Sequence, residues 1–291
     1  MDNAAGLALY ATRSGEEAGQ LAKKFADAGE PVVIAAGGDG TLNAVVSGLA
    51  GSKTALGVLP TGTMNVFARE LGIPFDNLDR AFEVILAGHV LEVDLFEANG
   101  TPFVQMAGFG FDAAVIEETT WESKKVLGPL AYLLSAVKVL GDQPPKMLVE
   151  TGDGRREEGV VVLAGNGSLY GGQFKLFHRA DNQDKKLDVL VFKEAGYKLV
   201  LDSLRGMATG EIDFGQSTVA YLQANSLRVS ADQEVPLEVD GEFIGRTSEV
   251  EFRAAERALR VLAPKEPIRS RFVEAMKAMM AWTTKPWKAT K

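Results

Sequence analysis

Two stretches near the start of the chain share one pattern, in which a short apolar run leads into a glycine turn and then into a helix-like repeat. Residues 32–36 form a continuous apolar run, which indicates a buried strand. The turn 37–41 follows, and from Leu42 onward apolar positions recur at helical spacing. Residues 55–59 and the turn 61–63 repeat the same order. The pattern therefore predicts two consecutive units of strand, glycine turn and helix.

The neighbouring segments also alternate between strand and helix. Residues 7–10 predict a short strand, Ser14 and Glu17 fit a capping box, and Gly29 ends the helix that follows. Residues 78–88 predict a further helix. This alternation predicts a parallel α/β sheet. Both glycine turns are then expected at the carboxyl edge, where open α/β sheets bind ligands.

Beyond residue 90 the pattern changes to short alternating strands separated by turns. Such a pattern predicts an antiparallel β-sandwich and places a domain boundary near residue 90. The segment 123–140 is an exception, because its apolar positions have helical spacing. The predicted strands are 91–96, 146–150, 160–163, 187–192, 227–229, 235–239, 249–252 and 258–262.

Composition narrows the classes of function. The chain has 291 residues, 46% of them apolar, and a formal charge of -8, which argues against a nucleic-acid binder. It contains no cysteine and only two histidines, so thiolate sites are excluded and histidine-based metal sites are disfavoured. No apolar run reaches the roughly 18 residues of a spanning helix, and no signal-peptide pattern opens the chain. We expect a cytoplasmic protein.

The turn 37–41, Gly-Gly-Asp-Gly-Thr, is the first candidate for chemistry. Its glycines allow positive φ angles and the close approach of a ligand, and the helix start behind them offers N–H groups to a phosphate. It fits neither of two common phosphate motifs, because Asn43 replaces the third glycine of the dinucleotide fingerprint and the Walker lysine is absent. Asp39 indicates a residue that binds a metal ion or transfers a proton, or else one that caps a helix or closes a turn. Both interpretations stay open.

The turn 37–41 with Leu42 and Asn43, together with residues 59–74 (LPTGTMNVFARELGIP), resembles the catalytic region of the diacylglycerol kinase family. More closely, it resembles the bacterial soluble lipid kinases related to sphingosine kinases. The resemblance implies an α/β nucleotide domain over 1–90, here without the family's first strand and helix. It implies a β-sandwich over 91–266, and a final helix, 267–291, that returns to the first domain.

The resemblance also implies a reaction, in which ATP and Mg²⁺ phosphorylate a hydroxyl of diacylglycerol or a related lipid. Expected partners are ATP, the lipid, a membrane surface contacted peripherally and, as an option, a second copy of the chain; nucleic acid is not among them. The alternatives are a nucleotide- or lipid-binding relative that has lost catalysis, and NAD kinase, whose second motif differs. The implied nucleotide contacts are Gly37, Gly38, Asp39, Gly40, Thr41, Asn43, Thr61, Gly62, Thr63 and Asn65.

Two acidic segments complete the predicted site. Asp240-Gly241-Glu242 has the pattern of a hairpin turn, and the resemblance implies that Asp240 and Glu242 supply the general base and a supporting carboxylate. Some relatives assign the base to the aspartate at position 39 instead, and the sequence leaves this choice open. The segment 181–188 resembles the family's magnesium turn, although Lys185 replaces a glycine and composition alone predicts a polar loop. Its implied ligands are Asp181, Asp184 and Asp188.

Overall fold

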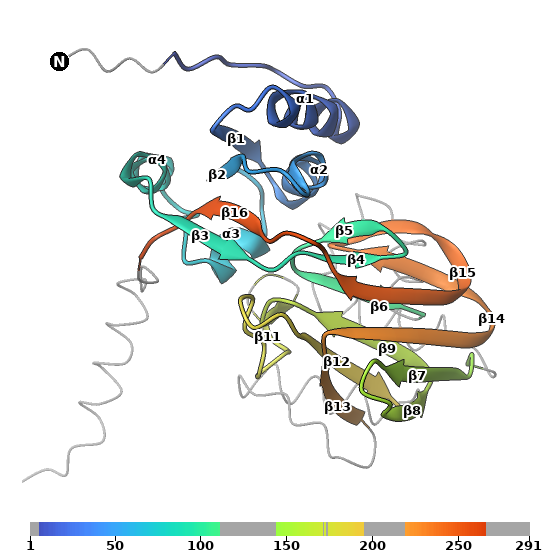
Figure 1. Cartoon of the computed structure of the whole chain (residues 1–291). Coiled ribbons are helices and arrows are strands. Elements are labelled where there is room, and N and C mark those ends of the chain that lie inside the picture. The colour runs from blue at the N-terminus through green and yellow to red at the C-terminus, as the bar shows by residue number, and fades with distance from the viewer. Residues whose placement is uncertain (1–5, 111–143, 171, 173, 195–218, 266–291) are drawn as a thin grey trace, which may run out of the picture.

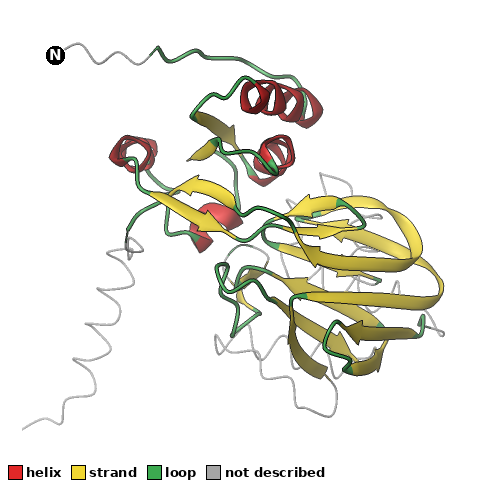
Figure 2. Cartoon of the chain, in the orientation of Figure 1, coloured by secondary structure: helices red, strands yellow, loops and turns green. Residues whose placement is uncertain are grey.

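The structure is a computed structural model that describes residues 6–110, 144–170, 172, 174–194 and 219–265. A small α/β unit and a larger, almost purely β unit are joined side by side (Figures 1 and 2). The predicted helices at 123–140 and 267–291 lie outside the described residues. Within the described part, no helix is long and apolar enough to cross a membrane.

The α/β unit is built on a four-stranded sheet with the order β1-β2-β16-β3. β1 (Val32–Gly37) and β2 (Ala55–Pro60) are parallel, and β16 (Leu259–Leu262) runs parallel to β2. β3 (Val90–Val93) is antiparallel to β16. The parallel α/β prediction is confirmed for β1 and β2. The boundary near residue 90 stays a prediction, and β3 and β16, on its far side in the sequence, pair with each other in this sheet.

The helices of this unit begin and end close to the predicted positions. They are α1 (Gly15–Asp27), α2 (Asp39–Leu49), α3 (Val66–Glu70) and α4 (Leu78–Ala87). The Ser14 side chain accepts a hydrogen bond from the Glu17 N–H at 3.2 Å, which caps α1 as predicted. Gly88 ends α4 in the left-handed conformation that a C-terminal glycine favours.

Two predictions for the start of this unit are wrong. Residues 7–10 form no strand, and Leu7 and Leu9 are 74% and 93% exposed. β1 is not a buried strand, since Val32 and Ala36 are exposed. The exposure of β1 follows from its position, because it pairs with β2 and with no other described strand, which makes it an edge strand.

The second unit is an antiparallel sandwich, as predicted. Its main sheet has the order β13-β12-β9-β6-β14-β15-β4-β5; β7 pairs with β14, β8 pairs with β7, and β10 and β11 form a separate pair. Buried phenylalanines, among them Phe96, Phe103 and Phe252, fill the space between its layers. The strands are β4 (Phe96–Ala98), β5 (Thr101–Phe103), β6 (Met106–Phe109), β7 (Met147–Thr151), β8 (Arg156–Gly159), β9 (Val161–Gly165), β10 (Leu169–Tyr170), β11 (Phe174–Lys175), β12 (Leu187–Phe192), β13 (Val219–Ala224), β14 (Ser226–Val239) and β15 (Glu242–Ala254).

The longest hairpin in the described part of the chain extends from the sandwich to the α/β unit. The sequence predicts separate strands at 227–229 and 235–239, but both belong to β14, which pairs with β15 along most of its length. A register shift between Ser230 and Val235 lets one strand continue past an irregular segment. β14 pairs with β7 before the shift and with β6 after it, and the hairpin ends beside α2.

Candidate functional site

The loops that follow β1 and β2 lie in direct contact. A Cβ atom on Gly62 would come within 2.5 Å of the Gly38 Cα atom, and one on Gly37 within 2.6 Å of the Thr41 Cβ atom. These glycines therefore permit close packing of the loops. Gly37, Gly38 and Gly40 do not adopt the positive φ angles that glycine allows, because only Gly38 separates strand β1 from helix α2.

Helix α2 begins at Asp39, three residues before the predicted Leu42. Asp39, Gly40 and Thr41 therefore form its first turn, where N–H groups have no partner within the helix. The N-cap residue, Gly38, has no side chain that could satisfy them. The start of α2 thus presents backbone N–H groups and the positive end of the helix dipole to an anion.

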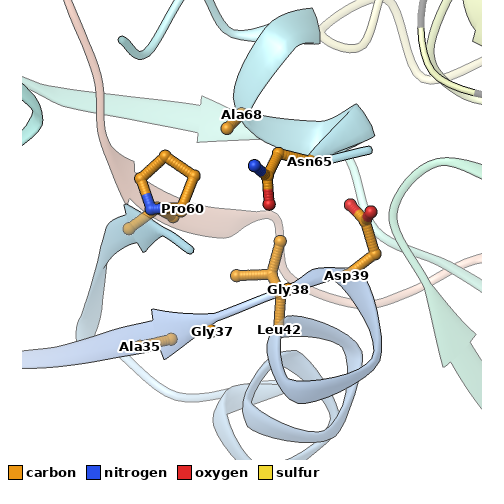
Figure 3. A pocket seen from close by; sticks show the side chains of 9 residues that line it. Ala35, Gly37, Gly38, Asp39, Leu42, Pro60, Asn65 and Ala68 are labelled. Atoms are coloured by element: carbon orange, nitrogen blue, oxygen red, sulfur yellow. The ribbon is translucent and has the colours of Figure 1, made fainter. Parts of the chain in front are cut away.

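The Asp39 carboxylate links the two loops. Its Oδ1 accepts a hydrogen bond from the Val66 N–H at 2.7 Å, and Figure 3 shows it directed toward the start of α3. Burial raises the pKa of Asp39, and the N–H groups at the start of α3 partly offset this rise. The helix-cap interpretation of Asp39 therefore holds, although the helix that it caps is α3.

Asn65 shapes the second loop. It has a φ angle of 48°, and its side chain exchanges hydrogen bonds of 3.0 and 2.8 Å with the Gly62 backbone. Asn65, the N-cap of α3, is buried, whereas Thr61 and Thr63 are exposed. The cavity beneath the two loops measures only about 10 Å³, room for one water molecule. A nucleotide would therefore lie over the loops and not between them.

Asp240 and Gly241 form the two-residue turn between β14 and β15, with φ angles of 47° and 81°. This is the predicted hairpin. The Asp240 carboxylate accepts three hydrogen bonds of 2.9 Å from the backbone N–H groups of residues 104–106. Burial raises the pKa of Asp240 to about 6, although these three N–H groups lower it. The carboxylate thus holds the turn against β5 and β6.

The tip of this hairpin lies against the start of α2. The Asn43 side chain donates a hydrogen bond of 2.8 Å to the Asp240 carbonyl, across 197 positions of sequence. A Cβ atom on Gly40 would lie 3.4 Å from Glu242 Oε1, so that exposed carboxylate is adjacent to the first turn of the helix. The structure therefore brings Asp240 and Glu242 beside the glycine loop.

A cleft of about 250 Å³ opens at this contact between the two units. One wall comes from α2, with Asn43 and Ser47, and another from β5, with Pro102. The hairpin supplies the third wall, with Glu242 and Ile244. The cleft thus combines polar groups near the start of α2 with apolar side chains from β5 and the hairpin.

The acidic segment 181–188 is organised differently. Asp181 Oδ1 accepts a hydrogen bond from the Gln183 N–H and Asp184 Oδ1 one from the Lys186 N–H, so both carboxylates close their own turn. Lys185 has a φ angle of 59°, at the position where the resemblance implies a glycine. Its N–H donates to Asp94 Oδ2 at 2.6 Å. Burial raises the pKa of Asp94, and the nearby charges of Asp184 and Asp181 contribute to the rise.

Asp188 has different hydrogen-bond partners from Asp181 and Asp184, and the ligand set of these three residues stays a prediction. Asp188 is fully buried in β12, where it accepts hydrogen bonds from the Tyr221 hydroxyl and from Gln223 Nε2. Burial raises the pKa of Asp188. Among the residues that the structure describes, no three His, Cys, Asp or Glu side chains are placed to hold a metal ion.

Glu70 and Gln105 take part in the site region without any signal in the sequence pattern. The Glu70 carboxylate accepts hydrogen bonds of 2.9 Å from the Ser168 hydroxyl and from the Leu169 N–H. It also accepts one of 3.1 Å from Gln105 Nε2, next to the backbone that holds Asp240. These contacts tie α3 to the sandwich. Only the position of Glu70 within the segment 59–74 could have drawn attention to it.

Comparison with known proteins assigns both units. Residues 2–98 match the diacylglycerol kinase catalytic domain, and residues 105–263 match the YegS C-terminal NAD kinase beta sandwich-like domain. A diacylglycerol kinase from Bacillus subtilis strain 168 is 31% identical over 261 residues, 88% of this chain and 86% of the relative. One from Staphylococcus aureus strain JH9 is 32% identical over 273 residues, 91% and 84% of the two chains.

Solved structures agree in fold. A Bacillus anthracis strain Sterne structure assigned to the diacylglycerol kinases superposes with a TM-score of 0.73 at 25% identity, over 87% of this chain and 83% of that one. An NAD kinase from Archaeoglobus fulgidus in complex with ATP gives 0.52 at 10% identity, over 92% and 88%, and shares the fold alone. With relatives above 30% identity along nearly its whole length, the chain belongs to the diacylglycerol kinase family of lipid kinases.

Proposed function

We propose that the chain transfers the γ-phosphoryl group of ATP to a hydroxyl of diacylglycerol or a related lipid. The observation that carries the proposal is the contact between the β14–β15 hairpin and α2, which puts the Glu242 carboxylate beside the first turn of that helix. Phosphoryl transfer requires bound phosphates and an oriented hydroxyl in one place. An anion-binding helix start with a carboxylate next to it supplies both.

The proposed nucleotide site lies over the two loops. The phosphates would meet the N–H groups at the start of α2, where the helix dipole favours negative charge. This location is the carboxyl edge of β1 and β2, the usual ligand edge of an α/β sheet. Gly62 and Asn65 would support the site by shaping the second loop, and the other proposed contacts are Gly37, Gly38, Asp39, Gly40, Thr41, Asn43, Thr61 and Thr63.

The three carboxylates of the site take different proposed roles. Glu242 is exposed in the cleft, so it would orient the acceptor hydroxyl and take up its proton. Asp240 accepts three backbone hydrogen bonds, so it would act as a positioning residue that holds Glu242 in place. Asp39 would fix both loops relative to each other through the start of α3.

Mg²⁺ fits this site only as an ion carried with the phosphates. Mg²⁺ is ordinarily bound by one or two carboxylates together with phosphate oxygens, so Asp39, in the first turn of α2, is the residue that would hold it. When bound, it would neutralise developing charge on the transferred group. The segment 181–188 fits less well, because the carboxylates of Asp181 and Asp184 close their own turns and Asp188 is buried elsewhere.

The test is a phosphorylation assay with purified protein, labelled ATP, Mg²⁺ and vesicles that contain diacylglycerol, sphingosine, ceramide or phosphatidylglycerol. We expect one lipid to become labelled and the label to disappear with Glu242→Gln. ATP binding, measured by calorimetry, should persist in that variant. Binding of ATP without labelling of any lipid in the wild type would favour a relative that has lost catalysis.

A further inference from the structure

The β-bulge next to Glu242 turns two adjacent apolar side chains toward the same cleft. Leu237 pairs with Gly245, but Glu238 pairs with Phe243, so β15 contains one extra residue, Ile244, at this point. In a regular strand successive side chains point to opposite faces. A bulge removes that alternation locally and can re-aim a side chain. Phe243 and Ile244 accordingly both line the cleft.

These two side chains stay accessible. Phe243 is 41% and Ile244 39% exposed, whereas Val239 on the opposite strand is buried. Isolated exposed apolar residues are common on protein surfaces. Here, however, two neighbours are directed by a bulge into a cleft that also contains Glu242. Their location indicates contact with the apolar part of an acceptor.

The size and charge of the cleft indicate which part of a lipid it accommodates. Its volume of about 250 Å³ lies below the range of about 300–1,000 Å³ of pockets for drug-sized ligands. A head group with the first carbons of its chains would fit, but two complete acyl chains would not. Among the described residues that line the cleft there is no lysine or arginine, so attraction of an anionic head group does not explain how a lipid is held.

We propose that Phe243 and Ile244 form an apolar lip that contacts the carbons of the acyl chains nearest the head group of the lipid acceptor. This inference rests on the proposed function, since it assumes that the acceptor hydroxyl lies near Glu242. The lipid enters the cleft with its head group first, and its chains pass over the lip while their ends remain in the membrane.

The absence of cysteine from the sequence permits a direct test of contact. A single environment-sensitive fluorophore is attached to Phe243→Cys, and to Leu86→Cys as a control, because Leu86 is 71% exposed on α4 and does not line the cleft. Each full-length protein is mixed with phosphatidylcholine vesicles that contain dioleoylglycerol. The acyl chains carry bromine, a quencher, either near the carboxyl end or near the methyl end.

The lip predicts quenching at position 243 by bromine near the carboxyl end of the chains, weaker quenching by bromine near the methyl end, and none at position 86. Absence of quenching at 243, or equal quenching at 243 and 86, would overturn the proposal. Because this readout needs no turnover, it is separate from the kinase assay. Quenching at position 243 in a protein that phosphorylates no lipid would support the apolar lip and contradict the proposed function.

A kinetic test is available if the protein phosphorylates diacylglycerol. The double variant Phe243→Ser with Ile244→Ser should lower kcat/KM for diacylglycerol in vesicles by about tenfold or more, since it removes two apolar contacts. The KM for ATP should stay unchanged, and Phe243→Leu should retain most of the activity. Leu86→Ser is the matched control. An unchanged kcat/KM in the double variant would contradict the lip.

Discussion

The turn at Asp240 and the segment 181–188 both carry carboxylates next to a residue in the left-handed conformation, yet these carboxylates bind different kinds of partner. The Asp240 carboxylate binds backbone more than 130 positions away, and the turn contacts α2. The Asp181 and Asp184 carboxylates bind N–H groups two residues along their own turn. The comparison teaches that the partners of the carboxylates, more than acidic composition, distinguish the two turns, because the segment 181–188 is joined to Asp94 through its backbone and not through the carboxylates of Asp181 and Asp184.

The largest effect is expected from Glu242→Gln. Loss of a group that orients the hydroxyl and accepts its proton should lower kcat by about 10²–10⁴-fold. The free energy of unfolding should barely change, because the side chain is exposed. Steady-state kinetics and urea titration measure the two effects. Glu251→Gln, exposed on the same strand, is the control, and equal activity losses in both variants would contradict the assigned role.

Asp240→Ala should mainly reduce stability. The substitution leaves the N–H groups of residues 104–106 without their acceptor, which should lower the free energy of unfolding by about 3 kcal/mol. Asp232→Ala is the control on the same strand, because Asp232 accepts a single backbone hydrogen bond, from Lys146. Similar losses of unfolding free energy in the two variants, measured by urea denaturation, would contradict a larger contribution of the Asp240 carboxylate.

The same carboxylate should make stability depend on pH. The pKa of Asp240 is about 6 in the folded protein against an ordinary 3.8, so the folded state holds this proton more tightly. The resulting stability is complete below pH 3.8 and is lost as the pH rises through about 6. Unfolding free energies measured across this range should fall more steeply in the wild type than in Asp240→Asn. Parallel curves would show that Asp240 does not titrate there.

Asp39→Ala should cost less stability. It removes the cap of α3, a loss of about 0.5–2 kcal/mol. Asn77→Ala removes the cap of α4 and is the matched control. Both variants should lose similar stability in thermal unfolding, but only Asp39→Ala should also weaken ATP binding. If both bound ATP equally well, the glycine loop would not depend on this cap.

The smallest effect concerns Lys185→Gly in the other acidic segment. Glycine tolerates the left-handed conformation at this position, so stability should rise by about 0.5–1 kcal/mol. Addition of Mg²⁺ should not change the Tm of either protein if the segment is only a closed turn. A Tm that rises with Mg²⁺ in the glycine variant would show that the lysine suppresses a metal site.

Much of the fold follows from local sequence signals. The serine cap of α1, the glycine that ends α4 and the Asp-Gly turn at Asp240 are determined by neighbouring residues, and all three agree with prediction. The sequence could not show that residues 7–10 form no strand or that β1 is exposed, because strand pairing and burial depend on partners elsewhere in the chain.

The candidate site shows the same limit. The sequence marked Asp39 and Asp188 as candidate residues, but it did not indicate that Asp39 caps a helix beyond the next strand, or that Asp188 bonds to Tyr221 on β13. The links of Glu70 to Ser168 and of Asn43 to Asp240 join positions about 100 and about 200 residues apart. Periodicity within one element contains no information about such contacts.

The position of β16 between β2 and β3 has a consequence for synthesis of the chain. The strand that joins these two neighbours is made only after nearly the whole sandwich has been translated. During synthesis, the sheet of the α/β unit therefore stays incomplete until β16 is made. Pairing of β16 with β2 is slow, because a long connection must be closed at an entropic cost. A chain that stops before residue 259 would leave β2 and β3 without the strand between them, so the unit that begins the sequence is finished last.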